Sequence, residues 1–287
     1  MRSVSIDQNT IDRAMEGDNE AFGMLVRANG SRSLIVAERI LRSPEEAVSA
    51  ARKLFVFTYT NLKKLKDLGV LEMWLMQNLV RVCGEVLKEA TKKGVALSQC
   101  EFPKDLATAG LLESVGAIDT AAGAPGALAA GAATSRAATA PVAAARREAV
   151  RKAIDCLPFL ERTAVIFRDW DGMSYLEVAD ILRVKHDDVR KLLVRGRRGV
   201  AEMLKPTVSE TNCGRVRDKI WLLAGGEVGP TETVDILTHL RQCSACAESL
   251  RTASTVVEAI RDAAAPEDKP LIAPEMLWKE VEPLLVR

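Results

Sequence analysis

Apolar residues recur at intervals of three and four along most of the chain, and the alternation typical of β-strands is hard to find. This periodicity predicts an all-α protein, since one face of each helix must be apolar to pack. The first helical block predicts a helical domain over residues 8–95. Its expected helices cover residues 10–28 with a break at Gly17-Asp18, residues 33–41, a stretch opening at Ser43-Pro44-Glu45-Glu46, and residues 71–90.

The pattern changes after residue 95. Residues 121–145 contain 14 alanines, 3 glycines and 2 prolines, too few large apolar groups to build a core, so we expect a flexible linker over residues 96–145. Helical periodicity returns in two further blocks, which we expect to form domains at 146–206 and 207–265. Residues 266–287 form a tail that ends in a short amphipathic helix, PEMLWKEVEPLLVR.

Charge is distributed unevenly, although the whole chain carries only +1. Residues 145–205 contain 14 Lys and Arg against 10 Asp and Glu, whereas residues 206–287 contain 9 against 13. A net charge of +4 beside one of −4 indicates an anion-binding segment next to a segment able to cover it. Solvated helix faces would give the same counts.

The amino terminus has no apolar run of the kind found in secretory signals, and no uncharged stretch approaches the roughly 20 residues of a membrane span. We therefore expect a cytoplasmic protein without a membrane partner. In that reducing compartment, six cysteines favour metal binding or redox chemistry over disulfides. Cys83, Cys100 and Cys156 lack ligand-spaced partners and are expected to be plain thiols.

A helix-turn-helix is predicted between Ser174 and Leu204. Ser174 and Glu177 form the capping-box pattern S-x-x-E, which starts a helix that ends near Arg183. After a short turn, Asp187 can cap the second helix. The first helix is expected to bury Leu176, Val178, Ala179, Ile181 and Leu182.

The second helix is predicted to have one packing face and one basic face. On a helical wheel, Leu193, Gly196, Val200 and Met203 fall near Val189, and Lys and Arg residues lie opposite or on the flank. A braced basic helix of this kind can enter the major groove of DNA and contact phosphates. A structural αα-hairpin with a solvated basic face is the alternative. The candidate DNA-binding residues are Lys185, His186, Asp188, Arg190, Lys191, Arg195, Arg197 and Arg198.

Metal ligands are predicted in the third block. His239, Cys243 and Cys246 have spacings of four and three residues, which converge either on one helix face or at the junction of two helices. Imidazole and thiolates suit Zn²⁺, and Cys213 can supply the fourth ligand of a closed site.

The sequence argues against three other uses of these cysteines. A redox C-x-x-C pair belongs to βαβ folds, a catalytic zinc needs an open position beside a base, and unliganded buried thiols would not explain His239. We therefore expect a structural zinc site and no enzyme. Oxidation of the thiolates could still release the metal and unfold the site, which leaves a redox role open.

Residues 150–204 resemble region 4 of the extracytoplasmic-function (ECF) sigma factors, which reads the −35 promoter element. The resemblance lies in Leu157-Pro158, Arg162, Val165-Ile166-Phe167, the Asp171-Gly172-x-Ser174-Tyr175 turn, and Glu177-x-Ala179-x-x-Leu182. The first block resembles region 2, in AMEGDNEAFGMLVRANGSRSLIVAERILRSPEEA and in the stretches FVFTYTNL and LEMWLMQNLVRV. This resemblance to region 2 implies that the first block binds the RNA polymerase core and opens the −10 promoter element. Ser49, Arg52 and Lys53 stand at the expected polymerase-binding positions, where the family usually has an acidic-and-amide signature.

Cys213, His239, Cys243 and Cys246 also fit the ligand pattern of the zinc-binding anti-sigma domain, a helical module that occludes sigma regions. The two resemblances together imply a transcription initiation factor that binds promoter DNA and core polymerase. They also imply control by an intramolecular contact with its zinc domain. The alternative is a sigma-like binding protein that no longer initiates transcription.

Overall fold

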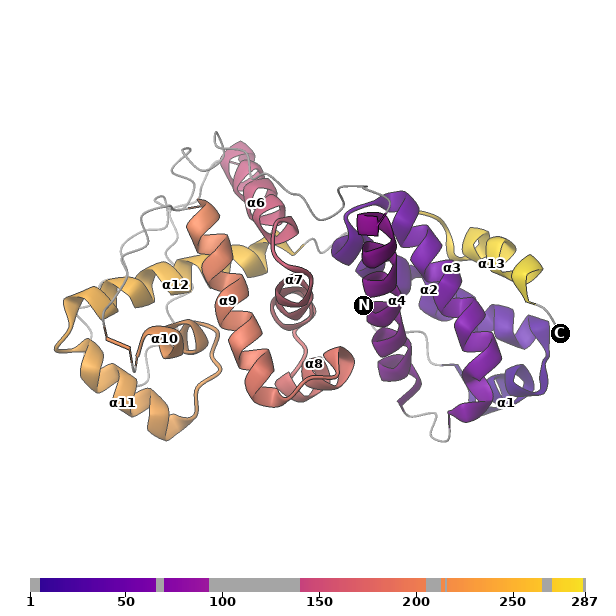
Figure 1. Cartoon of the computed structure of the whole chain (residues 1–287), viewed down its shortest axis with the longest axis horizontal. Coiled ribbons are helices and arrows are strands. Elements are labelled where there is room, and N and C mark those ends of the chain that lie inside the picture. The colour runs from indigo at the N-terminus through magenta and orange to yellow at the C-terminus, as the bar shows by residue number, and fades with distance from the viewer. Residues whose placement is uncertain are drawn as a thin grey trace. The chain divides into compact units, whose positions relative to one another are not determined.

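The computed structural model describes residues 6–65, 70–92, 140–204, 213–214, 216–264 and 270–285. Regular structure in these ranges is helical, without a strand, which confirms the all-α prediction (Figure 1). Contacts divide the chain into two compact units. The first contains residues 1–100, 174–186 and 265–287, and the second contains residues 101–173 and 187–264. Most of the predicted linker lies outside the described residues, but a helix begins within it at Ala140.

Short polar side chains start the helices of the first unit. Asp7 accepts a hydrogen bond from the backbone N–H of Thr10, and Asp18 accepts two from Glu20 and Ala21. Such N-caps satisfy backbone donors that have no partner within the helix. The helices are α1 (Gln8–Glu16), α2 (Asn19–Leu41), α3 (Pro44–Asn61), η1 (Leu62–Lys64), α4 (Leu71–Lys92), α8 (Tyr175–Leu182), α13 (Pro274–Val281) and η6 (Glu282–Leu284).

Helix α2 is longer than predicted, because it runs without interruption through the polar stretch Asn29–Arg32. Asn29 Nδ2 donates to the carbonyl of Leu25, and Ser33 Oγ donates to the carbonyl of Asn29. These local bonds satisfy side chains that are buried in the unit. The polar stretch between the two predicted helices therefore lies within one continuous helix.

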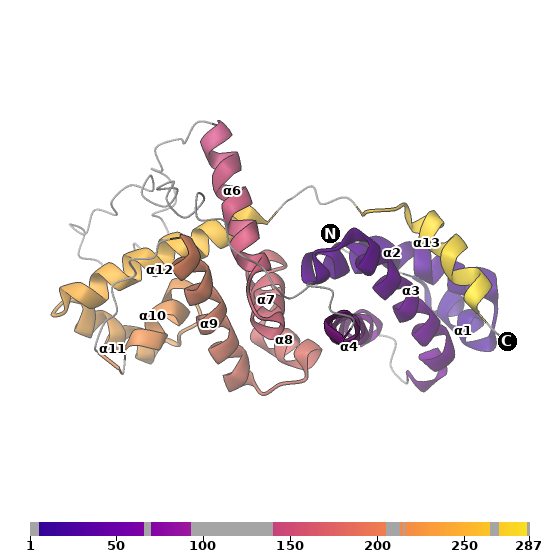
Figure 2. The same ribbon diagram turned by 45° about the horizontal axis from the view of Figure 1, so that its top comes forward.

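The core of the first unit lies between α2, α3 and α4, where Phe22, Leu54, Phe55 and Leu75 have no exposed surface. The C-terminal helix α13 packs against α2 and α3, although more than 200 residues separate them in sequence. In Figure 2, α13 lies along these two helices.

In the second unit, the long helix α12 packs against α10, α6 and η5. Figure 2 shows α10 and α6 beside it. Trp170 Nε1 donates to the carbonyl of Ile260, and Arg151 Nε donates to that of Ala263. The elements are α6 (Ala140–Asp155), α7 (Phe159–Val165), the π-helical turn η5 (Ile166–Trp170), α9 (His186–Leu204), α10 (Arg217–Ala224), α11 (Pro230–Leu240) and α12 (Ser244–Ala263).

The helix pair predicted between Ser174 and Leu204 corresponds to α8 and α9. The capping box is confirmed, since Ser174 Oγ accepts from the N–H of Glu177 and the Glu177 carboxylate accepts from the N–H of Ser174. Arg183 ends α8 in a left-handed conformation. The prediction for Leu176 is wrong: this side chain is 58% exposed, because it projects from the opposite face to buried Val178 and Ile181.

The described residues also bear on the predictions for Cys156 and for membrane-spanning helices. Cys156 is disulfide-bonded, so the prediction of a plain thiol at that position is wrong. No helix in the described part of the chain has the length and apolar character needed to cross a membrane.

Candidate metal centre and nucleic-acid interface

The four predicted metal ligands meet where three helices of the second unit approach one another. Cys213 lies in the turn before α10, and its carbonyl accepts hydrogen bonds from the N–H groups of Val216 and Arg217. His239 is in the last turn of α11. Cys243 is the N-cap of α12, and Cys246 follows in its first turn. The histidine therefore ends one helix and the cysteines begin the next, which is the second of the two arrangements that their spacing allows.

The spacing of the four donor atoms fits a tetrahedral zinc site. One donor atom from each residue lies within 4.8 Å of the other three. The Cys213 and Cys243 Sγ atoms are 3.9 Å apart, and His239 Nε2 is 3.3 Å from Cys246 Sγ. Zinc bonds of usual length would put sulfur atoms about 3.8 Å apart at tetrahedral angles. Three thiols and one imidazole also form a donor set that zinc prefers.

The start of α12 favours the thiolate form of Cys243. The backbone N–H of Cys246 lowers the pKa of the Cys243 thiol, and the side chains of Cys246 and Cys213 and the N–H of Ala245 act in the same direction. Unpaired N–H groups at a helix N-terminus stabilise a negative charge. A metal binds the thiolate rather than the thiol, so this position supports ligand formation.

The predicted DNA-binding residues differ in their exposure. Lys185, His186, Lys191 and Arg195 are exposed, and Asp188, Arg190 and Arg198 are partly exposed. Lys191 Nζ lies 3.0 Å from Asp188 Oδ1, which makes a pair on the surface of α9. Phosphates could therefore reach several cations of this helix.

Acidic residues of the zinc-binding segment pair with two of the partly exposed arginines. Arg190 Nη2 on α9 lies 3.4 Å from the carboxylate of Glu232 on α11. Lys219 holds the same carboxylate at 2.7 Å, and these partners lower the pKa of Glu232. Arg198 lies 3.8 Å from Asp218 on α10. Each of these arginines thus shares its charge with a carboxylate of the neighbouring domain.

Arg197 is fully buried, unlike the other candidates. Its guanidinium donates five hydrogen bonds, two to Asp169, two to Glu227 and one to the carbonyl of Trp221, at 2.6–3.2 Å. A guanidinium has five N–H donors, so every one is used. In this structure Arg197 binds two carboxylates and is not accessible to a phosphate, contrary to its predicted place on the flank of the basic face.

The Arg197 cluster joins the helix-turn-helix region to the zinc-binding segment. Asp169 belongs to η5 and Glu227 to the turn between α10 and α11, and neither side chain is exposed. Burial alone would lower the pKa of Arg197, but the hydrogen bonds and charges of the two carboxylates outweigh it and raise that pKa. Glu227 also accepts from Arg168 Nε at 3.0 Å. A Cβ on Gly225 would overlap Arg197 and Glu227, so a larger residue there would displace side chains of this cluster.

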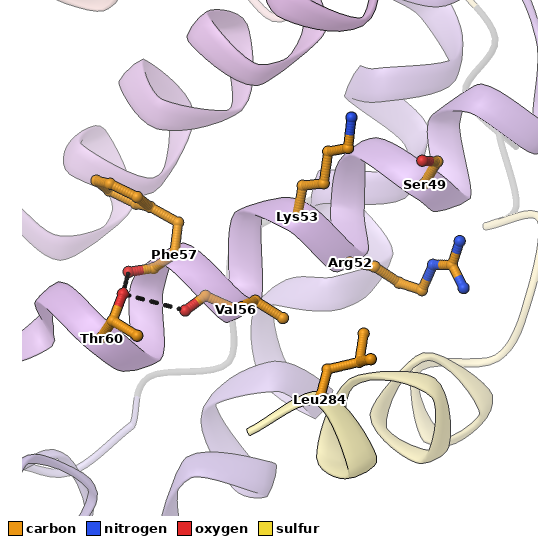
Figure 3. Close-up of a pocket in the computed structure, with 7 residues that line it drawn as sticks. All are labelled: Ser49, Arg52, Lys53, Val56, Phe57, Thr60 and Leu284. Carbon is orange, nitrogen blue, oxygen red and sulfur yellow. Dashed lines mark hydrogen bonds between the residues drawn. The ribbon is translucent and has the colours of Figure 1, made fainter. Parts of the chain in front are cut away.

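The predicted polymerase-binding residues lie on α3 and line a shallow groove (Figure 3). Ser49 and Arg52 are partly exposed, and Lys53 is exposed, with its Nζ 3.2 Å from Glu89 on α4. Leu284 of η6 lines the same groove. The structure therefore places part of the C-terminal tail beside this surface.

Two family profiles match the chain, one on each side of residue 205. The profile "Sigma-70, region 4" matches residues 147–198, and the profile "Putative zinc-finger" matches residues 213–247. The RNA polymerase sigma-H factor of Pseudomonas aeruginosa is 24% identical over 208 residues, which cover 71% of this chain and 96% of that protein. The ECF RNA polymerase sigma-E factor of Escherichia coli K12 is 23% identical over 206 residues, with 70% and 96% coverage.

These matches place a segment similar to the DNA-binding region 4 of sigma factors before a helical domain with a Cys₃His cluster. The chain is thus similar to ECF sigma factors, and its C-terminal domain is similar to the zinc-finger domain typical of anti-sigma factors. The resemblance predicted from the sequence is thereby confirmed.

Proposed function

We propose that this chain directs RNA polymerase to promoters in the bacterial cytoplasm and that its C-terminal zinc-binding domain regulates it in cis. Homology to sigma factors across 71% of the chain supports the first part. Region 4 supplies a helix-turn-helix whose second helix carries exposed cations, the form in which such motifs contact the DNA backbone.

The observation that carries the regulatory part is the pairing of α9 with carboxylates of the zinc-binding domain. Glu232, Asp218 and Glu227 approach Arg190, Arg198 and Arg197 in turn. A phosphate must compete with these carboxylates for the same guanidinium groups. Because DNA affinity depends steeply on the number of phosphates neutralised, loss of two or three cations would weaken binding strongly. The zinc-binding domain therefore acts as a mimic of the anionic backbone.

The metal's proposed role is structural, with Zn²⁺ held by Cys213, His239, Cys243 and Cys246. Zinc bound there would supply folding free energy, since unfolded chains lack a preformed site. These ligands tie the turn before α10, the end of α11 and the start of α12 to one point. The carboxylates Asp218 and Glu232 lie on two of the elements so tied, which links metal binding to the position of the charges that face α9.

Regulation in cis can be tested by duplex DNA binding of the full chain. Asp218→Asn with Glu232→Gln removes two carboxylates that face α9 and leaves the buried cluster intact. We expect the double variant to bind DNA at least tenfold more tightly at low salt, with a steeper salt dependence because more phosphates are engaged. The control is Glu258→Gln, an exposed charge on α12. Equal affinity of the double variant and the wild type would refute the regulatory mechanism.

A second candidate function is a sigma-like DNA-binding protein that does not initiate transcription. The observation that favours it is the presence of Ser49, Arg52 and Lys53 on the α3 surface in place of the acidic-and-amide signature, which changes its charge. Pull-down with purified core polymerase and run-off transcription distinguish the two. Core binding with initiation supports the sigma function, and DNA binding without core binding supports the alternative.

A further inference from the structure

The exposed face of α9 carries an acidic residue near the start of the helix. Asp188 lies in the first turn, and Lys191 and Arg195 follow it after three and seven residues. At about 100° per residue, these three side chains fall within about 60° of one another, on a face that excludes the fully buried Val189 and Leu193. The first turns of α9 therefore present one acidic and two basic groups in a row.

Asp188 and Lys191 form a pair that still has surface for a further partner. Lys191 Nζ donates to Asp188 Oδ1 at 3.0 Å, and the side chains of Lys191 and Asp188 are 65% and 45% exposed. An ammonium group has three donors and a carboxylate has two acceptor oxygens, so each can bind a second group while the pair stays intact. The lysine also fixes the direction of the carboxylate.

A carboxylate at this position needs a favourable partner if α9 enters the major groove of DNA. The N-terminal residues of a recognition helix contact base edges, and phosphates repel a carboxylate. The donors that the groove offers are the amino groups of cytosine and adenine. The adenine amino group lies between two acceptors, adenine N7 and thymine O4, whereas the cytosine amino group has one acceptor beside it, guanine O6. Because acceptors repel a carboxylate, Asp188 favours cytosine.

The guanine of the same base pair suits Lys191. Guanine O6 and N7 are both acceptors, and lysine is one of the side chains that usually donate to them. The cytosine amino group and guanine O6 lie side by side in the groove, so two side chains that are one turn apart and already in contact can reach them together. The Asp188–Lys191 pair thus matches the order of donor and acceptors on one C·G base pair.

We propose that Asp188 and Lys191 select one C·G base pair in the DNA site of this chain, with Asp188 accepting from cytosine N4 and Lys191 donating to guanine. This inference rests on the proposed DNA-binding function and specifies part of the sequence that it requires. The competing role for Asp188 is stabilisation of α9 alone, since an acid in the first turn interacts favourably with the helix dipole. That role gives no base preference.

The test is selection of duplex DNA from a randomised library by the full chain, followed by affinity measurements on the selected site with each base pair replaced in turn. We expect the wild type to select C·G at the position in question, and replacement of this pair to weaken binding about fivefold or more. Asp188→Asn should shift the preference there to A·T, because an amide both accepts from and donates to adenine. Lys191→Ala should weaken the preference for C·G without creating another.

Glu202→Gln is the matched control, since it removes an exposed acid that lies 4.0 Å from Arg198, 14 residues and about 21 Å further along α9. It should leave every base preference unchanged. Identical preferences in the wild type and Asp188→Asn, or a uniform rise in the affinity of Asp188→Asn for all sequences, would overturn the base-reading role and leave DNA binding intact. Failure of the wild type to select any sequence would instead refute the proposed function on which the inference rests.

Discussion

Replacing Glu227 by glutamine should destabilise the second unit by about 3–5 kcal/mol, the range found when one partner of a buried ion pair is removed. Glu227 accepts two hydrogen bonds from Arg197 and one from Arg168, and its side chain has no exposed surface. Each of the two hydrogen bonds that still reach the amide oxygen weakens by about 1 kcal/mol when the acceptor becomes neutral. The glutamine NH₂ also faces a guanidinium donor, which leaves about 1–3 kcal/mol of unmet hydrogen bonding.

Urea denaturation of the full chain, followed by tryptophan fluorescence, measures this effect. Trp170 and Trp221 belong to the second unit and report its unfolding, and the control is the exposed Glu258→Gln, which should change stability by less than about 0.5 kcal/mol. If Glu227→Gln and Glu258→Gln shift the transition equally, the buried cluster does not stabilise the docked zinc-binding domain. Metal content should be measured alongside, because loss of zinc would destabilise the unit independently.

Further variants test individual parts of the structure. Cys213→Ser should abolish stoichiometric zinc binding, measured by elemental analysis, and reduce helix content by circular dichroism, since one of four ligands is lost. Ser174→Ala should raise hydrogen exchange in α8, because loss of an N-cap costs about 1 kcal/mol. Acidification should also raise hydrogen exchange in α8. Hydrogen bonds from Ser174 hold the pKa of Glu177 in the folded protein below its ordinary 4.5. The stability that Glu177 contributes is therefore present above pH 4.5 and is lost as the pH falls through the lowered pKa of the folded protein. Gly225→Ala should lower the melting temperature, because its Cβ overlaps the buried cluster.

The helical fold and the clustering of the ligands followed from local patterns. Helical periodicity predicted the helices, and the capping box at Ser174 predicted the start of α8. In the metal cluster, His239 and the two cysteines are spaced by four and then three residues. This spacing brings the three side chains together, whether they lie on one helix or at the junction of two. Leu176 was placed wrongly because periodicity assigns an apolar residue to the core without knowing which face of the helix is covered.

The buried charges and the position of the tail could not be predicted in the same way. Arg197 resembles its exposed neighbours on a helical wheel, and only the tertiary fold brings Asp169 and Glu227 to it from 28 and 30 residues away. Gly23 and Gly30 weaken a helix when considered alone. In the structure they leave room for Trp278 and Leu277, which lie more than 240 residues later in the chain. One signal was available: two glycines spaced seven residues apart within an apolar pattern mark a surface where another element approaches closely.

The most direct test of the central claim is run-off transcription with core polymerase, on a promoter selected from a randomised DNA library. The proteins compared are the wild type, Asp218→Asn with Glu232→Gln, and Glu258→Gln, all as full chains. If the zinc-binding domain restrains region 4 through its carboxylates, the double variant should yield at least several-fold more transcript than the wild type, and Glu258→Gln should match the wild type. Equal transcript from all three would contradict regulation in cis, and no transcript from any would contradict the sigma function itself.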